Sequence, residues 1–245
     1  MGFRYHGWQV QPNVKTVQKM VERTLSFVFE HKEFKVLGAS RTDMMVSAHM
    51  SAFELFVDEP LDAYYLKKRL NKSLPNDIRV LEVEEVSEKF NIIKDSKEKE
   101  YLYLFSYGEK IHPFCAPFMQ GYLENLDIEL MQRGAKLFEG IHNFQRYAYK
   151  PSERTNFIRE INLCEIVENT VYTANFFPEK SFVFRVKGSG FMRYQVRLMM
   201  GVLYQLGKGE VTIEFIKDTI ENPNANTLKE LAPASGLQLV QITFL

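Results

Sequence analysis

Two arginines lie in the most apolar stretch of the sequence, where a charged side chain needs a chemical reason. Residues 190–206 are apolar at almost every position, which predicts a buried helix. Arg193 and Arg197 lie four residues apart, so this helix would place both on one side. A guanidinium there either reaches solvent along its alkyl stem or is paired with a carboxylate or phosphate. We expect the first arrangement for Arg193 and a buried anion as the partner of Arg197.

The candidate anion is Asp43, in a loop that follows a short apolar segment. An aspartate in such a loop is usually part of a turn or a cap. Small residues precede it, however, and Arg41 lies two positions before it. An aspartate held by arginines would have its pKa lowered by about 1–3 units, and the ionised carboxylate could act as a nucleophile or a base. The structural and the catalytic interpretation both remain open at this point.

Three further features carry weaker signals. Tyr101 begins an aromatic strand face, which is typical of sheet packing, although a tyrosine at a cleft edge could stack on a base. The Gly188-Ser189-Gly190 segment lacks a full phosphate-binding pattern, so a turn is the favoured interpretation. The five histidines have no spacing that indicates a metal site.

The elements that must position these residues alternate between helices and strands. Helices are expected at 13–31 with Asn13 as the cap, 62–72 with Asp62 as the cap, 127–140, 190–206 and 212–221, and strands at 34–37, 48–57, 78–86, 101–107, 157–167, 171–177, 181–187 and 237–244. Strands joined in hairpins and interrupted by helices predict an α+β fold with a largely antiparallel sheet. Prolines without periodicity place a boundary after 107, giving subdomains 1–107 and 108–245.

Composition and charge exclude several classes of protein. The 245 residues are 45% hydrophobic and 25% charged, which argues against disorder and fibrous folds. No segment approaches the about 20 apolar residues of a membrane span, and residues 1–12 do not resemble a signal peptide. Two cysteines give no disulfide framework, so the expected location is the reducing cytoplasm. The net charge is zero, but residues 181–209 contain five bases and no acid, a weak indication of an anionic ligand.

Six short motifs, in order along the chain, resemble those of the TruA family of tRNA pseudouridine synthases. They are Gly7-Trp8-Gln9, Ser40-Arg41-Thr42-Asp43 with Val46, Lys99-Glu100-Tyr101-Leu102-Tyr103, Gly140-Ile141-His142-Asn143-Phe144, Gly190-Phe191 through Val196-Arg197 to Gly201, and Ala232-Pro233-Ala234-Ser235-Gly236-Leu237. Together they cover nearly the whole sequence. The chain is therefore identified as similar to this family.

The resemblance implies an isomerase that converts uridine to pseudouridine in tRNA, most plausibly in the anticodon stem-loop (tRNA positions 38–40). Asp43 would be the catalytic aspartate, Tyr101 the residue against the target base, and Arg197 and Arg41 the basic partners. The expected RNA-binding residues are Gln9, Tyr5, Arg193 and Lys187. No cofactor or metal is implied, and no membrane. Two related subdomains would form one largely antiparallel mixed sheet, with helices packed on it, an RNA-binding cleft, and a homodimer as the working unit.

Several positions depart from the family pattern. The family's apolar strand before Gly7 has no counterpart in residues 1–6, so we expect that strand to be missing. Ser40 replaces a glycine, and Met44-Met45 replace Ala-Gly beside the aspartate, which should narrow or reshape the pocket. These changes keep an alternative open, an inactive or retargeted RNA-binding homologue. An unrelated anion-binding enzyme would rest on Gly188-Ser189-Gly190 alone.

Overall fold

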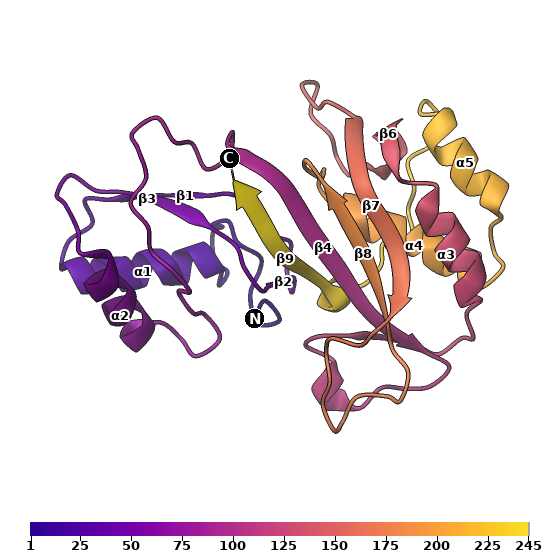
Figure 1. Ribbon diagram of the computed structural model, residues 1–245, viewed down its shortest axis with the longest axis horizontal. Coiled ribbons are helices and arrows are strands. Elements are labelled where there is room, and N and C mark those ends of the chain that lie inside the picture. The colour runs from indigo at the N-terminus through magenta and orange to yellow at the C-terminus, as the bar shows by residue number, and fades with distance from the viewer. Residues whose placement is uncertain (245) are drawn as a thin grey trace.

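A seven-stranded sheet forms the centre of the fold in the computed structural model, which describes residues 1–244 (Figure 1). Its strands are β2 (Ser47–Ala48), β4 (Ser96–Tyr107), β5 (Gln120–Tyr122), β6 (Gly140–Asn143), β7 (Ile158–Glu168), β8 (Phe182–Gly188) and β9 (Leu237–Phe244). The order is β2-β9-β4-β8-β7-β6, with β5 against β4. Only β2–β9 and β4–β5 are parallel pairs among the described strands. The predicted α+β class with a largely antiparallel sheet is confirmed.

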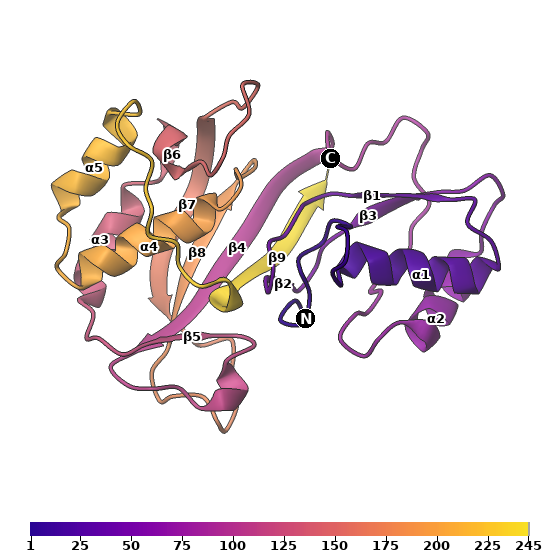
Figure 2. The ribbon, with the colours of Figure 1, turned by 180° about the vertical axis from the view of Figure 1, so that it is seen from behind.

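Three helices lie together on one face of this sheet (Figure 2): α3 (Ile128–Lys136), α4 (Gln195–Gly207) and α5 (Ile213–Glu221). Their apolar residues form the main core with the strands, and α4 is buried along most of its length, as predicted. The helix starts later than expected, because Tyr194 has a left-handed backbone conformation with φ 65° that interrupts the helical path. Arg193 therefore precedes α4, and the two arginines do not share a helical face.

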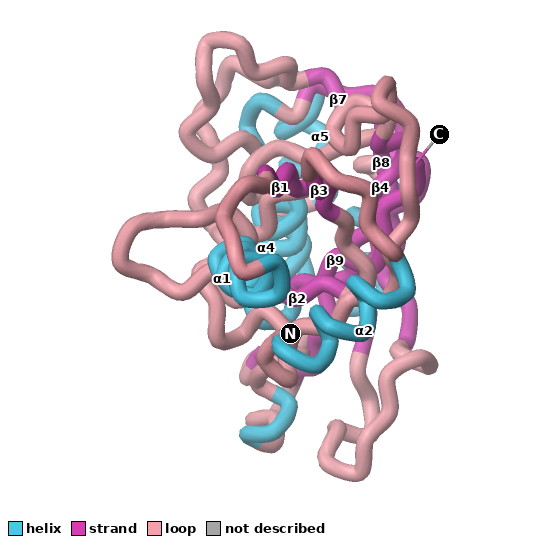
Figure 3. The backbone as a smooth tube through the Cα atoms, turned by 90° about the vertical axis from the view of Figure 1, so that its left-hand side faces the viewer, coloured by secondary structure: helices cyan, strands magenta, loops and turns pink. Residues whose placement is uncertain are grey.

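A smaller unit lies beyond β2 and β9, at one end of the molecule (Figures 1 and 3). It consists of α1 (Val17–Phe29), α2 (Ala63–Ser73) and the antiparallel pair β1 (Lys35–Gly38) and β3 (Phe53–Phe56). Trp8, Leu25 and Leu70 belong to its separate apolar core. Residues 1–16 contain no strand, in agreement with the expectation that this segment lacks one.

Polar side chains explain where the helix ends differ from the sequence prediction. Asn13 does not cap α1, because its φ of 58° places it in a left-handed turn, and the Thr16 side chain instead accepts a hydrogen bond from the Lys19 amide. Asp62 caps α2 as predicted. Asp127 caps α3, which ends at Lys136, and residues 140–143 form β6 against β7 where the motif had suggested a helix end.

Two predicted strands are absent from the described chain. At 78–86 the Asn71 side-chain amide bonds both the N–H and the C=O of Val80, each at 2.8 Å, and so substitutes for a neighbouring strand. Residues 171–177 lie in the loop between β7 and β8, which pair directly from Glu168 opposite Phe182, and three aromatic residues of this loop pack on a small apolar cluster. The predicted strand at 48–57 is divided into β2 and β3, which belong to different sheets. In the two segments without strands, 78–86 and 171–177, the apolar residues reflect packing and not ladder formation.

Candidate active site

Asp43 and Arg197 come from opposite ends of the sequence and meet between the two units of the fold. Asp43 lies on the loop between β1 and β2, and Arg197 lies in the first turn of α4. The distance from Arg197 Nη1 to Asp43 Oδ2 is 3.8 Å, and the two side chains are 11% and 23% exposed. The structure thus gives Arg197 the carboxylate partner that its buried position required.

Arg197 is held by more than its charge partner. Its Nε donates a hydrogen bond of 2.7 Å to the Ala232 carbonyl, and its guanidinium lies 5.0 Å from the centre of the Tyr194 ring. The chain around Ala232 can approach α4 this closely because Gly201 has no side chain, and a Cβ there would overlap the Glu230 carbonyl. The guanidinium is therefore fixed before any ligand binds, which suits a group that must orient a reacting carboxylate.

The loop that carries Asp43 is braced from behind by the start of the chain. The Trp8 amide donates to the Thr42 carbonyl at 3.3 Å, and the Met45 amide donates to the Tyr5 carbonyl at 3.0 Å. Gly7, with φ +79°, lies so close to the Thr42 carbonyl that a Cβ would overlap it. Residues 5–8 therefore fix the backbone on both sides of Asp43.

Burial raises the pKa of Asp43, although Arg197 and, more weakly, Arg193 lower it. The sequence had led us to expect a lowered pKa, and this expectation was wrong in direction. The loss of hydration raises the pKa more than the arginines lower it, because even the Arg197–Asp43 distance of 3.8 Å is long for an ion pair. A carboxylate that is poorly solvated in its ionised form is a stronger base and nucleophile, so the shift favours reaction at Asp43.

Tyr101 forms the inner wall of the site. Its side chain is 7% exposed, and its ring lies edge-on to Phe191 with centroids 5.4 Å apart. The β4–β9 pairing shifts register between Glu100 and Tyr101, and such a bulge redirects the side chain of the strand. The Tyr101 hydroxyl is 3.2 Å from Ser40 Oγ, and burial raises its pKa. The sequence did not single out Ser40 or Phe191 as contacts of this tyrosine, because both are distant in sequence.

The arginine expected next to Asp43 is not the one found there. Arg41 is exposed and, within residues 1–244, makes no ion pair, whereas Arg193 acts on Asp43 electrostatically. The Arg193 guanidinium is itself exposed and lies over Tyr149 and Tyr194, at 5.3 and 4.9 Å from the ring centres. The second basic partner of Asp43 is therefore Arg193, and not Arg41 as we had expected.

The other expected RNA-binding residues occupy different environments. Gln9 is exposed next to the Asp43 loop. Tyr5 is 1% exposed, and its hydroxyl donates to Asp77 at 2.8 Å, so its position fits packing and not RNA contact. Lys187 forms an ion pair with the buried Glu100 at 3.1 Å, and Arg185 shares that same carboxylate. Of the five bases at 181–209, only Arg193 lacks an acidic partner within 4.0 Å in the described chain.

Two other departures from the motif pattern have visible consequences. Met44 is half exposed, so its side chain is not packed into the protein interior beside Asp43. Met45 has φ 68°, a left-handed conformation that an L side chain rarely adopts, and it forms part of a tight turn in which the Val46 amide donates to the Asp43 carbonyl at 3.2 Å. The Gly188-Ser189-Gly190 segment ends five residues before α4 begins, so it does not present a helix N-terminus to an anion.

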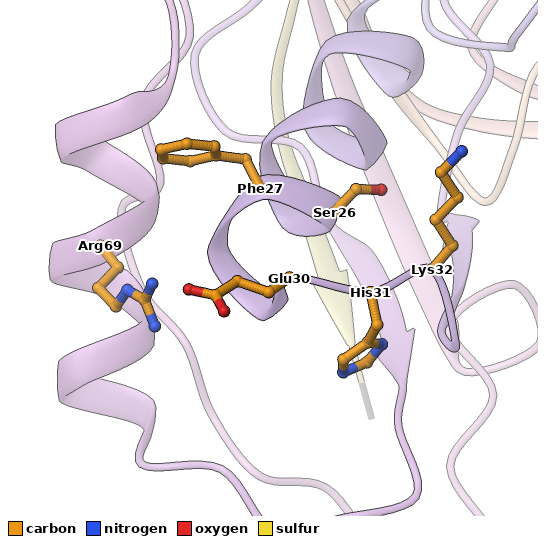
Figure 4. A pocket seen from close by; sticks show the side chains of 6 residues that line it. All are labelled: Ser26, Phe27, Glu30, His31, Lys32 and Arg69. Atoms are coloured by element: carbon orange, nitrogen blue, oxygen red, sulfur yellow. The ribbon is translucent and has the colours of Figure 1, made fainter.

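A separate hollow lies between the end of α1 and α2 (Figure 4). It is lined by Ser26, Phe27, Glu30, His31, Lys32 and Arg69. This hollow is at the end of α1 farthest from the large sheet and includes none of the residues discussed above (Figure 1). In residues 1–244 no group of His, Cys, Asp and Glu is arranged to hold a metal ion. No helix of that range is long and apolar enough to cross a membrane.

Comparison with known proteins finds relatives that cover nearly the whole chain. A family model described as tRNA pseudouridine synthase matches residues 1–93 and 135–244. The chain is 34% identical to tRNA pseudouridine synthase A 2 of Bacillus cereus, over 99% of this chain and 96% of that protein. It is 30% identical to tRNA pseudouridine synthase A of Thermodesulfovibrio yellowstonii, with the same two shares covered. The matched residues include the Asp43 loop and all of α4.

Proposed function

The chain belongs to the TruA family of tRNA pseudouridine synthases, and from this premise we propose that it acts on uridines of the anticodon stem-loop, at tRNA positions 38–40. It is an isomerase: the product has the same atoms as the substrate, with the base joined to ribose through carbon 5. The observation that carries the assignment of the reaction to this site is the partly buried Asp43–Arg197 pair beside Tyr101.

We assign the central chemical step to Asp43. In one route its carboxylate bonds covalently, either to carbon 1 of the ribose, which breaks the glycosidic bond, or to the base, whose carbon–carbon double bond opens. In the other it removes a ribose proton, and the glycosidic bond breaks to leave a glycal and the released base. Both routes require the ionised carboxylate, which Arg197 holds in place. The target uridine must leave the base stack, at a cost of a few kcal/mol that contacts in the pocket offset. The ring of Tyr101 supplies such a contact.

The test of the proposed target is to map pseudouridine. Cellular tRNA with and without this gene is compared, and the purified protein is assayed on full-length tRNA and on an isolated anticodon stem-loop. We expect pseudouridine at positions 38–40 to depend on the gene and on the protein. Pseudouridine at another position would overturn the anticodon assignment alone. Normal tRNA binding without any pseudouridine would support the alternative of an inactive RNA-binding homologue.

We also propose that exposed cations around Asp43 contact tRNA phosphates, chiefly Arg193 and Arg41, with Gln9 beside them. In Arg193→Gln, the slope of log affinity against log salt concentration should fall by about 0.7–0.9, the value of one phosphate contact. The matched control is Lys187→Gln, because Lys187 is already paired with Glu100. The slope of this control should stay unchanged. Equal slopes for the wild type and Arg193→Gln would remove Arg193 from the contact.

Homodimerisation and a cytoplasmic location complete the proposal. Both cysteines, Cys115 and Cys164, are buried free thiols, which supports a reducing compartment. Light scattering of the purified protein, with and without tRNA, measures the mass of the working unit. A mass of one chain in both conditions would contradict the homodimer.

A further inference from the structure

The hydroxyl of Tyr101 is buried and has a single protein partner. Within residues 1–244, its only hydrogen bond is with Ser40 Oγ, at 3.2 Å. A buried hydroxyl without a partner would lose its hydration uncompensated, so this contact sets the direction in which the hydroxyl points.

Both ends of this hydrogen bond are held in place. On one side, Ala39 is fixed by its amide, which donates to the Ala52 carbonyl, and by Lys99 Nζ, which donates to the Ala39 carbonyl, each at 3.0 Å. On the other side, the Tyr101 backbone is paired with Val186 of β8 and Leu239 of β9. The hydrogen bond therefore links two anchored segments, the Asp43 loop and the central strand of the sheet.

We propose that Ser40 is a positioning residue, which holds the Tyr101 hydroxyl in its working orientation relative to the Asp43 carboxylate. The inference rests on the proposed function of this site, because it acts only through Tyr101. Ser40 lies three residues before Asp43, so one loop positions both groups that face the target nucleotide. A donor hydroxyl next to Tyr101 also lowers the pKa of that phenol, against the opposite effect of burial.

The experiment is a double-mutant cycle on tRNA pseudouridine formation. In Ser40→Ala we expect kcat to fall by about tenfold with little change in KM, the effect of one hydrogen bond made in the reacting complex. In Ser40→Thr, which retains a hydroxyl, most of kcat should be recovered. In a Tyr101→Phe background, Ser40→Ala should have no further effect, because the group through which Ser40 acts is gone.

A matched control separates positioning from packing. Tyr103 lies two residues along the same strand, and its buried hydroxyl donates to the Pro233 carbonyl at 2.8 Å. Tyr103→Phe should lower the melting temperature. In that background Ser40→Ala should still lower kcat as it does in the wild type, in contrast to its lack of effect in the Tyr101→Phe background.

The outcomes that overturn the two proposals differ. If Tyr101→Phe is strongly impaired while Ser40→Ala matches the wild type, the role of Ser40 is refuted and the role of Tyr101 stands. The role of Ser40 is also refuted if Ser40→Ala lowers kcat equally in both backgrounds. If Tyr101→Phe has full activity, the proposed role of Tyr101 is refuted, and the role of Ser40 is refuted with it because Ser40 acts only through Tyr101.

Discussion

Asp43→Asn will abolish pseudouridine formation and leave the fold intact. Asparagine has nearly the same shape but neither ionises nor forms an ester readily, so the loss should reach at least the about 10²–10⁴-fold that a positioned acid–base group supplies. The measurement is single-turnover pseudouridine formation on tRNA, together with thermal unfolding. The same substitution at Asp58, an exposed loop residue, is the control and should retain full activity.

The raised pKa of Asp43 fixes the sign of the stability effect. A carboxyl whose pKa is higher in the folded protein binds its proton more tightly there, so stability falls as pH rises from the ordinary pKa of aspartate through the raised one. At neutral pH the ionised Asp43 therefore costs folding free energy, and Asp43→Asn should melt no lower than the wild type. This advantage should disappear below the ordinary pKa, where both side chains are neutral.

The same shift predicts the pH dependence of the wild-type enzyme. Because catalysis needs ionised Asp43, the acid limb of kcat/KM should lie above the ordinary range of an aspartate. Activity of Asp43→Asn above about a tenth of wild type would remove Asp43 from its role. The same conclusion would follow if Asp43→Asn were unfolded at the assay temperature, because the loss of activity would then be explained by the loss of the fold.

Arg197→Ala will lose both activity and stability. The substitution removes the hydrogen bond to the Ala232 carbonyl, the contact with Tyr194 and the charge beside Asp43. A hydrogen bond from a charged group contributes about 1.5–3 kcal/mol. The about 3–5 kcal/mol for breaking a fully buried ion pair is an upper bound here, because the pair is 3.8 Å apart and Asp43 is 23% exposed.

Arg197→Met separates the packing of the side chain from its charge. Methionine keeps most of the apolar stem, so this variant should be more stable than Arg197→Ala but no more active. Removing the guanidinium also raises the pKa of Asp43 further, and any residual activity should have its acid limb at higher pH. Chemical denaturation and the pH profile measure these effects. Unchanged unfolding and an unchanged acid limb in Arg197→Ala would show that the pair has no role.

The meeting of Asp43 and Arg197 could be predicted from the sequence because few arrangements satisfy an arginine within an apolar helix. The cap at Asp62 was equally predictable, since its hydrogen bond to an amide three residues later depends only on local geometry. The late start of α4 was not, because it depends on the left-handed turn at Tyr194.

The pKa of Asp43 and the charge pairing around the site could not be predicted from the sequence, because both depend on the folded chain. The pKa of Asp43 depends on how completely the folded chain removes water from it, which no local pattern reports. The pairing of Lys187 with Glu100 depends on which residues β4 and β8 place side by side. A run of basic residues in the sequence therefore overstated the free positive charge on this surface.

The candidate active site is a contact between distant parts of the chain. Asp43 and residues 5–8, which brace its loop, lie early in the sequence, whereas Arg197 belongs to α4, late in the sequence. Such contacts form only after large loops have closed, and they therefore form more slowly than the local contacts of a helix. Catalytic competence will thus be among the last properties that a refolding chain regains. Turnover is accordingly a stricter report of complete assembly than helical content.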